Sequence, residues 1–193
     1  MKILKKLCSE NSNTVLFVVG NGPNMQQMKK EAGKLGLQKN IVFFGSKNDV
    51  KPFYKACDVE LICSLSEGLT LTTYEAMAMK RPVVSANVGG QKELIDNTCG
   101  RIVDNIQKQQ DLFIEDYSEE EIDRYAKALN EILDSKDYEE MKENARKKIL
   151  NGFTIGNMKK IMTKEIEELT SNKSKVGLDS PKYREMYSQY FVL

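Results

Sequence analysis

The sequence has 193 residues, of which 40% are hydrophobic and 30% charged, and its formal net charge is +1. These values fit one globular domain and leave no overall positive field that would draw nucleic acid. The longest apolar run, residues 15–19, is far shorter than the roughly 18 residues that a membrane helix needs, and no secretory signal opens the sequence. We therefore expect a cytoplasmic protein with reduced cysteines.

The residue types narrow the chemistry further. The sequence has no histidine, which is the commonest general base and metal ligand, and its four cysteines include no C-x-x-C pair. We therefore predict no metal site. Chemistry has to rest on carboxylates, hydroxyls, amines and backbone dipoles.

In chain order, residues 1–9 are typical of the end of a helix, so we expect that a first strand is missing in front of them. Short runs rich in valine and isoleucine predict strands at 14–19, 41–44, 59–63, 82–85 and 100–103. Amphipathic stretches between them predict helices at 25–35, 50–56 and 73–79. Because strands and helices alternate, we expect a Rossmann-like α/β fold, in which helices flank one parallel sheet.

The second half of the sequence is predominantly helical in pattern. A polar, insertion-like stretch at 104–119 precedes predicted helices at 120–133, 138–150 and 155–170. Residues 171–193 are polar with a late aromatic cluster and are predicted to form a tail or docking helix. The sequence thus predicts a binding domain at 1–170, with extra C-terminal helices, and a tail at 171–193.

Ligands of open α/β sheets bind outside the carboxyl ends of the strands, so the loops that follow the strands are candidate sites. Gly20 and Gly22 follow the first strand, where they suit either close backbone approach to a ligand or a tight strand-to-helix turn.

The loop after the second strand offers Gly45, Ser46 and Lys47 to a nucleobase and a phosphate. Alternatively, Ser46 or Asn48 caps the next helix.

The loop after the third strand gives the strongest signal. It carries Glu67, a glycine and a hydroxyl-rich turn before a helix start, whose backbone N–H groups attract phosphate and sugar oxygens. Glu67 and Glu75 are separated by seven residues and are expected to face one cleft. Alternatively, Glu75 forms a capping box with Thr72, and Glu67 is an exposed loop carboxylate.

Three other features are assigned structural roles. Lys80 and Arg81 follow a predicted helix, where cations interact favourably with the helix dipole. Gly89 and Gly90 are expected to form a turn and a helix start. The lysines at 29–39 are expected to be a solvated helix face.

The block E-G-L-T-L-T-T-Y-E-A-M-A, followed by P-V-V-S and V-G-G-Q-K-E-L, resembles the retaining GT-B glycosyltransferases of family 4. The order of V-V-G-N-G-P, V-F-F-G and A-C-D-V is similar too, and the resemblance covers about residues 4–170. It implies the C-terminal, nucleotide-sugar-binding domain of such an enzyme. The implied substrate is a UDP- or GDP-linked sugar, with no cofactor required.

The resemblance implies roles for individual residues. Glu67 is the implied catalytic carboxylate beside the transferred sugar, and Glu75 accepts hydrogen bonds from the ribose hydroxyls. The commoner family turn reads G-F-G-L-P, so Thr70 and Thr72 replace its second glycine and its proline. The other expected donor-binding residues, from this turn and the two earlier loops, are Gly68, Leu69, Thr70, Leu71, Gly45, Ser46, Lys47, Gly20 and Gly22.

The implied function is sugar transfer to a glycan or lipid acceptor in capsular, exopolysaccharide or other cell-surface glycan synthesis, which would allow peripheral membrane association. The family's acceptor-binding domain and its diphosphate-clamping arginine and lysine fall outside this sequence. We therefore expect the isolated chain to be inactive, or to depend on a partner chain that supplies the acceptor-binding domain. The alternative is a non-catalytic nucleotide-sugar-binding or partner subunit. A dinucleotide-dependent oxidoreductase is disfavoured because no G-x-G-x-x-G follows a strand.

Overall fold

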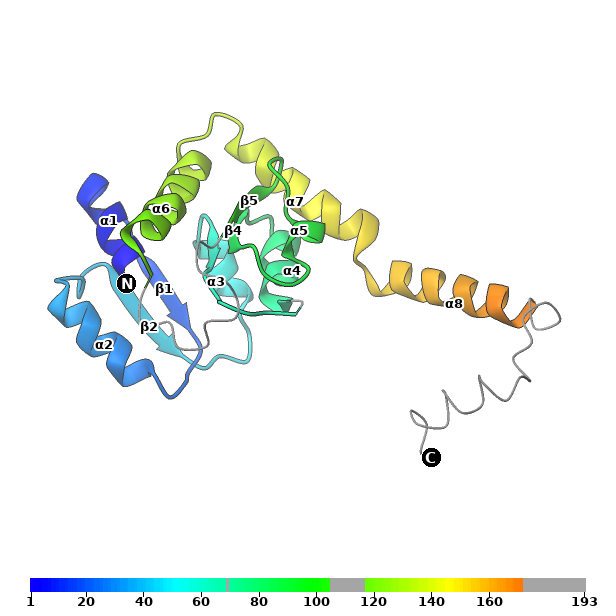
Figure 1. Cartoon of the computed structure of the whole chain (residues 1–193), viewed down its shortest axis with the longest axis horizontal. Coiled ribbons are helices and arrows are strands. Elements are labelled where there is room, and N and C mark those ends of the chain that lie inside the picture. Colours follow the sequence, from blue (N-terminus) through cyan, green and yellow to red (C-terminus); the bar gives the residue numbers. More distant parts are fainter. Residues whose placement is uncertain (69, 105–116, 172–193) are drawn as a thin grey trace. The chain divides into compact units, whose positions relative to one another are not determined.

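The computed structural model describes residues 1–68, 70–104 and 117–171 (Figure 1). The strands, in chain order, are β1 (Leu16–Val19), β2 (Ile41–Gly45), β3 (Glu60–Ile62), β4 (Val83–Ala86) and β5 (Gly100–Val103). The helices are α1 (Lys2–Glu10), α2 (Met25–Lys34), α3 (Lys51–Ala56), α4 (Leu71–Ala78), α5 (Gln91–Leu94), α6 (Glu119–Leu133), α7 (Tyr138–Gly152) and α8 (Ile155–Ser171). The predicted tail falls almost wholly outside the described residues, as does most of the predicted insertion.

The chain forms two compact units, Met1–Leu150 and Asn151–Leu193. The first unit contains every described strand. In the second unit, α8 exposes a series of apolar side chains, namely Ile155, Met158, Ile161, Met162, Ile166 and Leu169. Among the described residues, no helix combines the length and the apolar character that crossing a membrane requires.

All strand pairs are parallel, which confirms the expected α/β fold. β1 pairs with β2, with a register shift between Val18 and Val19, and the second sheet has the order β3-β4-β5. In that sheet, Leu61 lies opposite Val84, and Val84 lies opposite Arg101. The backbone hydrogen bonds therefore form two parallel sheets in the described part of the chain, where the sequence predicts one.

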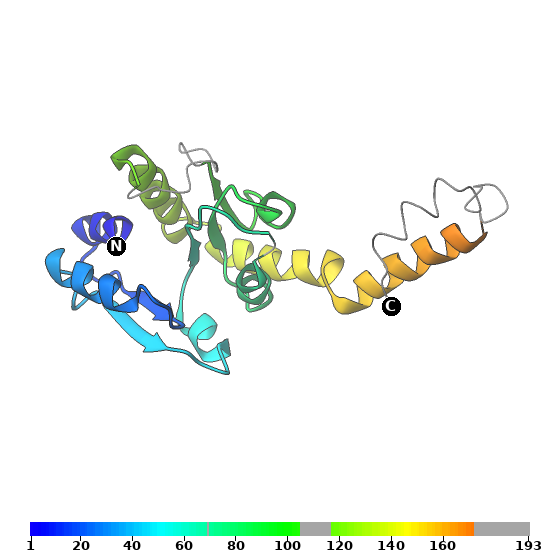
Figure 2. The same cartoon turned by 60° about the horizontal axis from the view of Figure 1, so that its bottom comes forward.

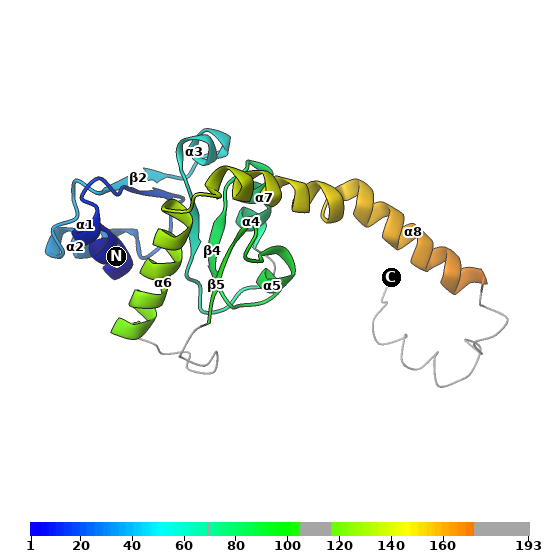
Figure 3. The same cartoon turned by 90° about the horizontal axis from the view of Figure 1, so that it is seen from above.

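Helices cover both faces of the β3-β4-β5 sheet. Successive side chains of a strand point to opposite faces, so apolar residues on each face pack against these helices. Leu61, Val84 and Val103 pack with residues of α1 and α6, whereas Ile62 and Val83 pack with residues of α4, α5 and α7. Figure 3 shows α6 on one side of β4 and β5, and α4 and α5 on the other. All four residues of β4 are 0% exposed, so this strand is the centre of the core.

The β1-β2 sheet is less deeply buried. Its main cluster joins Ile41 to Leu4 of α1, Ala32 of α2 and Leu37, with β1 residues at its margin. Figure 2 shows α1 and α2 beside β1 and β2. On α1, Ile3 and Leu7 pack instead into the cluster that contains β4. Helix α1 therefore contributes to the cores of both sheets.

The start of α6 shows how local sequence sets an element boundary. The Ser118 hydroxyl accepts a hydrogen bond from the Glu121 backbone N–H at 3.2 Å, and the Glu121 carboxylate accepts one from the Ser118 N–H at 3.1 Å. This reciprocal capping box satisfies two N–H groups that the helix itself leaves unpaired. The helix therefore begins at Glu119, one residue before its predicted start.

Candidate functional site

The loops after β1 and β2 contact each other at their predicted site glycines. Gly20 has a φ of 129° and Gly45 a φ of 66°, values that favour glycine. The Gly20 N–H donates to the Gly45 carbonyl at 2.9 Å. Gly22 follows in the same loop, where its N–H donates to the Asn21 side chain at 3.0 Å. The structure thus brings the first two candidate loops together.

The alternative role of Ser46 or Asn48 as a helix cap is wrong. The N-cap of α3 is Val50, which forms no side-chain cap. Asp49 instead accepts a hydrogen bond from the Lys51 N–H at 3.1 Å. Ser46 and Lys47 are exposed beside the carboxyl end of β2, where a ligand can reach them.

The loop after β3 rests on the turn after β4. The Gly90 N–H donates to the Gly68 carbonyl at 3.0 Å. Gly89 has a φ of 51°. A Cβ on it would lie 2.0 Å from the backbone carbonyl oxygen of Gly68 and 2.3 Å from that of Glu67. Gly89 therefore has to be glycine for the two turns to pack, which gives the G-G pair its expected role as a turn and helix start. Leu69 lies outside the described residues.

The start of α4 differs from the predicted capping box. The helix begins at Leu71 with Thr70 as its N-cap, so Thr72 already lies inside the helix and does not pair with Glu75 as a cap. Thr70 makes no side-chain cap to the helix. Its hydroxyl accepts a hydrogen bond from the Gln91 amide at 2.7 Å. Leu71 is 73% exposed at this helix end.

Glu75 lies on an exposed part of α4 and is held by a tyrosine of α3. The Tyr54 hydroxyl lies 3.2 Å from a Glu75 carboxylate oxygen and 3.4 Å from the Thr72 carbonyl, and it donates toward both. Burial and the nearby Glu60 and Glu75 carboxylates raise the pKa of Tyr54, so its hydroxyl stays protonated and remains a donor.

Glu60, at the start of β3, is a buried carboxylate near this pair. Burial raises its pKa to about 7; the charge of Glu75 acts in the same direction, and a hydrogen bond from Thr72 opposes it. One Glu60 carboxylate oxygen is buried without a hydrogen-bond partner. Ionising Glu60 is therefore costly in the folded protein.

Hydrogen bonds bring two predicted site residues together, Gly20 and Gly45, and they join Gly68 to Gly90, Thr70 to Gln91 and Glu75 to Tyr54. Glu67 is half-buried in its loop, and its common cleft with Glu75 remains a prediction. Sequence reasoning missed Tyr54, Glu60 and Gln91 as members of these contacts. The only available signals were a single charge in an apolar strand, at Glu60, and an amide directly after the G-G pair, at Gln91.

The remaining polar features have structural roles. Lys80 forms an ion pair with Glu143 of α7 at 2.5 Å, and Arg81 donates to the Lys55 carbonyl at 3.3 Å. The four lysines between 29 and 39 are exposed, as expected. All four cysteines are free, and burial raises the pKa of the Cys8, Cys57 and Cys99 thiols. The described residues include no group of three or more acidic or cysteine side chains placed to hold a metal ion.

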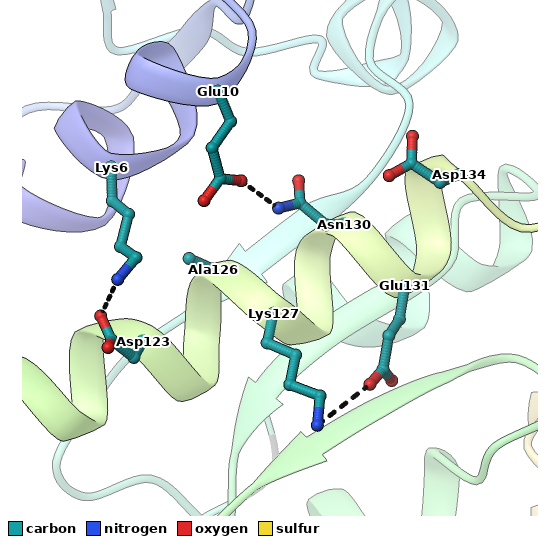
Figure 4. Close-up of a pocket in the computed structure, with 8 residues that line it drawn as sticks. All are labelled: Lys6, Glu10, Asp123, Ala126, Lys127, Asn130, Glu131 and Asp134. Atoms are coloured by element: carbon teal, nitrogen blue, oxygen red, sulfur yellow. Dashed lines mark hydrogen bonds and ion pairs between the residues drawn. The ribbon is translucent and has the colours of Figure 1, made fainter.

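A groove between α1 and α6 contains none of the predicted site residues (Figure 4). Its walls pair Lys6 with Asp123, and the Asn130 amide donates to Glu10 at 2.5 Å. Lys127 lies 4.0 Å from Glu131 on the same helix. Each of these side chains therefore has a partner, and two of the three pairs join α1 to α6. The groove is explained by these polar contacts between the two helices.

A family model described as glycosyl transferases group 1 matches residues 1–148. The chain therefore belongs to the group 1 glycosyltransferase family, and its parallel α/β architecture agrees with the GT-B fold of its structural neighbours.

Among curated proteins, the chain is similar to the Escherichia coli UDP-Gal:alpha-D-GlcNAc-diphosphoundecaprenol alpha-1,3-galactosyltransferase. The two are 31% identical over 144 residues, which are 74% of this chain and 34% of that enzyme. The chain thus spans about a third of that relative's length.

Two solved structures share the fold. The pneumococcal O-GlcNAc transferase GtfA, in complex with UDP and GlcNAc, superposes with a TM-score of 0.72 at 19% identity, over 88% of this chain and 32% of GtfA. Anabaena HepE, in complex with UDP, gives a TM-score of 0.68 at 18% identity, over 86% of this chain and 44% of HepE.

Proposed function

We propose that this chain is the donor-binding domain of a retaining glycosyltransferase of family 4. It holds a nucleoside-diphosphate sugar, linked to UDP or GDP, for transfer to a glycan or lipid acceptor in capsular, exopolysaccharide or other cell-surface glycan synthesis. Family membership supports the class of reaction. The name of the E. coli relative supports a UDP-linked donor and a lipid-linked acceptor.

The packing of the β3 loop on the β4 turn is the observation that carries the proposal. Gly89 and Gly90 fix the backbone of Glu67 and Gly68 beside the start of α4. The partial positive charge of a helix N-terminus stabilises anions, here the diphosphate as it leaves the sugar. Glu67 lies in this turn, where we assign it to the transferred sugar as the catalytic carboxylate.

The nucleoside is assigned to the other polar groups. Glu75 accepts the ribose hydroxyls, and Tyr54 orients its carboxylate by a hydrogen bond. The carboxyl ends of β1 and β2 carry the loop glycines Gly20, Gly22 and Gly45 and the exposed Ser46 and Lys47. There these residues can contact the nucleobase and the phosphates of the nucleotide.

The acceptor side is assigned to a further domain, which we propose is on another chain.

A further strand is also part of the proposal. Within the described residues, β1 pairs only with β2 and β3 only with β4, so β1 and β3 both lie at edges of their sheets. A parallel strand that pairs with both edges would join the two sheets. The proposed complex works at the cytoplasmic side of a membrane, with peripheral association through its lipid acceptor.

Nucleotide binding by the purified chain tests the proposal. We expect Glu75→Gln to weaken binding of UDP or GDP by roughly 1 to 3 kcal/mol, the range for hydrogen bonds to charged groups, as measured by calorimetry. Glu140→Gln, at an exposed position of α7, is the matched control and should bind as the wild type does. An unchanged affinity in a folded Glu75→Gln variant would remove Glu75 from the site.

Catalysis is tested in the complex with an acceptor-binding domain. We expect Glu67→Ala to reduce transfer far more than nucleotide affinity, because it removes a group that acts on the transferred sugar. Equal losses would contradict the catalytic assignment. A wild-type complex that binds the nucleotide but transfers no sugar would instead identify a non-catalytic binding subunit.

A further inference from the structure

Gln91, the first residue of α5, is a buried amide that joins Thr70, the N-cap of α4, to Thr73 within that helix. Its side chain is 1% exposed. Its Nε2 donates to the Thr70 hydroxyl at 2.7 Å, and its Oε1 accepts from the Thr73 hydroxyl at 3.0 Å. A buried amide is stable only when it is hydrogen-bonded, so these contacts fix the amide and both hydroxyls in place.

The bond to Thr70 changes how α4 begins. A threonine at the N-cap ordinarily accepts a hydrogen bond from a backbone N–H of the first turn. Thr70 occupies the N-cap but makes no such cap, and its hydroxyl instead accepts a hydrogen bond from the Gln91 amide. The Thr73 N–H donates to the Thr70 carbonyl at 3.1 Å, so the first-turn N–H group that the missing side-chain cap leaves to another acceptor is that of Thr72.

Gln91 is also continuous with the turn that holds the Glu67 loop. It directly follows Gly90, whose N–H donates to the Gly68 carbonyl. The same short segment thus contacts both Gly68 in the loop and Thr70 at the N-cap of α4.

We propose that Gln91 is a positioning residue of the donor site, which holds Thr70 away from the helix cap so that the first-turn N–H group of Thr72 can bind the nucleotide's diphosphate. This inference rests on the proposed function and adds a residue that acts through Thr70 and Thr73. Thr70 stands where the commoner family turn has glycine, which has no hydroxyl to cap a helix. A threonine at this position brings a hydroxyl that can cap the helix, and Gln91 gives that hydroxyl a different partner.

Binding of UDP and GDP, each compared with its nucleoside, separates this role from general stabilisation. Gln91→Met keeps the side-chain length and removes the amide. We expect its affinity for the nucleoside diphosphate to fall about tenfold, the loss expected when a hydrogen-bonding arrangement is removed, with the affinity for uridine or guanosine unchanged. Thr73→Val should give a smaller loss, and the double variant should lose no more than Gln91→Met alone, because both changes break one network.

Ser85→Ala is the control. Ser85 is also 0% exposed and its hydroxyl donates to the Ala86 carbonyl, but it lies within β4. This variant should bind both diphosphate and nucleoside as the wild type does. An equal fall in diphosphate and nucleoside affinity in Gln91→Met, or no fall in either, would overturn the proposal. If Gln91→Met does not fold, the same comparison on Thr73→Val decides.

Amide hydrogen exchange without nucleotide gives a second readout. In Gln91→Met we expect slower exchange at the Thr72 N–H, because the released Thr70 hydroxyl can accept a hydrogen bond from it and cap the helix. Unchanged exchange there would refute the role of Gln91 whatever the nucleotide result. A wild-type chain that binds neither UDP nor GDP would reject the proposed function, and the exchange measurement would still test how Gln91 acts on the helix start.

Discussion

The two sheets of the first unit use the same type of strand in different surroundings. All four residues of β4 are 0% exposed and lie between helices on both faces of the β3-β4-β5 sheet. All four residues of β1 are only half-buried. One face of β1 meets α1 and α2, and on the other Phe17 contacts Phe44 edge-on, with ring centroids 5.2 Å apart.

This difference divides the proposed donor site. The Glu67 loop and the start of α4 are built on the deeply buried sheet, and the Gly20 and Gly45 loops on the shallower one. We therefore expect the part assigned to the sugar and diphosphate to be held more rigidly than the part assigned to the base, because local stability follows buried apolar contact.

The largest expected effect is at Gly89, where the deeply buried sheet meets the Glu67 loop. Gly89→Ala adds a Cβ that would lie 2.0 Å from the Gly68 oxygen, at a φ of 51°. We expect a loss of roughly 3 kcal/mol in the free energy of unfolding, from left-handed strain and overpacking together, measured by urea denaturation.

Gly36→Ala is the matched control for Gly89→Ala. Gly36 has a φ of 73° but open space where its Cβ would lie. We expect it to lose only about 1 kcal/mol, the contribution of backbone strain alone. Equal losses of unfolding free energy at the two positions would show that the Glu67 loop moves to accommodate the added Cβ. That result would contradict a rigid backbone in the proposed sugar-binding turn.

The sequence predicted most of this fold because the elements are locally periodic. Each of the five predicted strands is present, and the predicted helices begin and end within a few residues of their observed bounds. The four residues of α5 are too few for a periodic pattern, so only a helix start was expected there. The division into two sheets depends on pairing between distant segments, which no local pattern contains.

The candidate site was less predictable than the fold. The positive φ values of Gly20 and Gly45 agree with the expected turns, because glycine identity alone favours that conformation. The capping box at Thr72 was wrong because α4 begins at Leu71, two residues before the predicted start, with Thr70 as its N-cap and bonded to Gln91. Side-chain partners such as this one depend on tertiary contacts that a single sequence does not show.

Truncation of one valine in each sheet tests the comparison directly. Val84 of β4 is 0% exposed, whereas Val18 of β1 is partly buried at the edge of its cluster. We expect Val84→Ala to lower the free energy of unfolding by about 2 kcal/mol and Val18→Ala by about 1 kcal/mol, because the cost of a cavity grows with the contacts that are lost. Chemical denaturation measures both values, and equal losses would remove the proposed difference between the sheets.

The smallest expected effect concerns Glu60, the exception within the deeply buried sheet. Burial raises the pKa of this carboxyl to about 7, from an unfolded value of about 4.3. Ionised Glu60 therefore destabilises the folded state: the penalty is absent below about pH 4, develops between pH 4 and 7, and is complete above that range. We expect Glu60→Gln to raise the free energy of unfolding by about 1 kcal/mol at pH 8 and to change it little at pH 4. Denaturation at both pH values measures this difference, and an equal effect at the two would mean that Glu60 does not titrate as a buried acid. A gain confined to high pH would show that the ionised Glu60 carboxylate destabilises the folded protein at the start of β3.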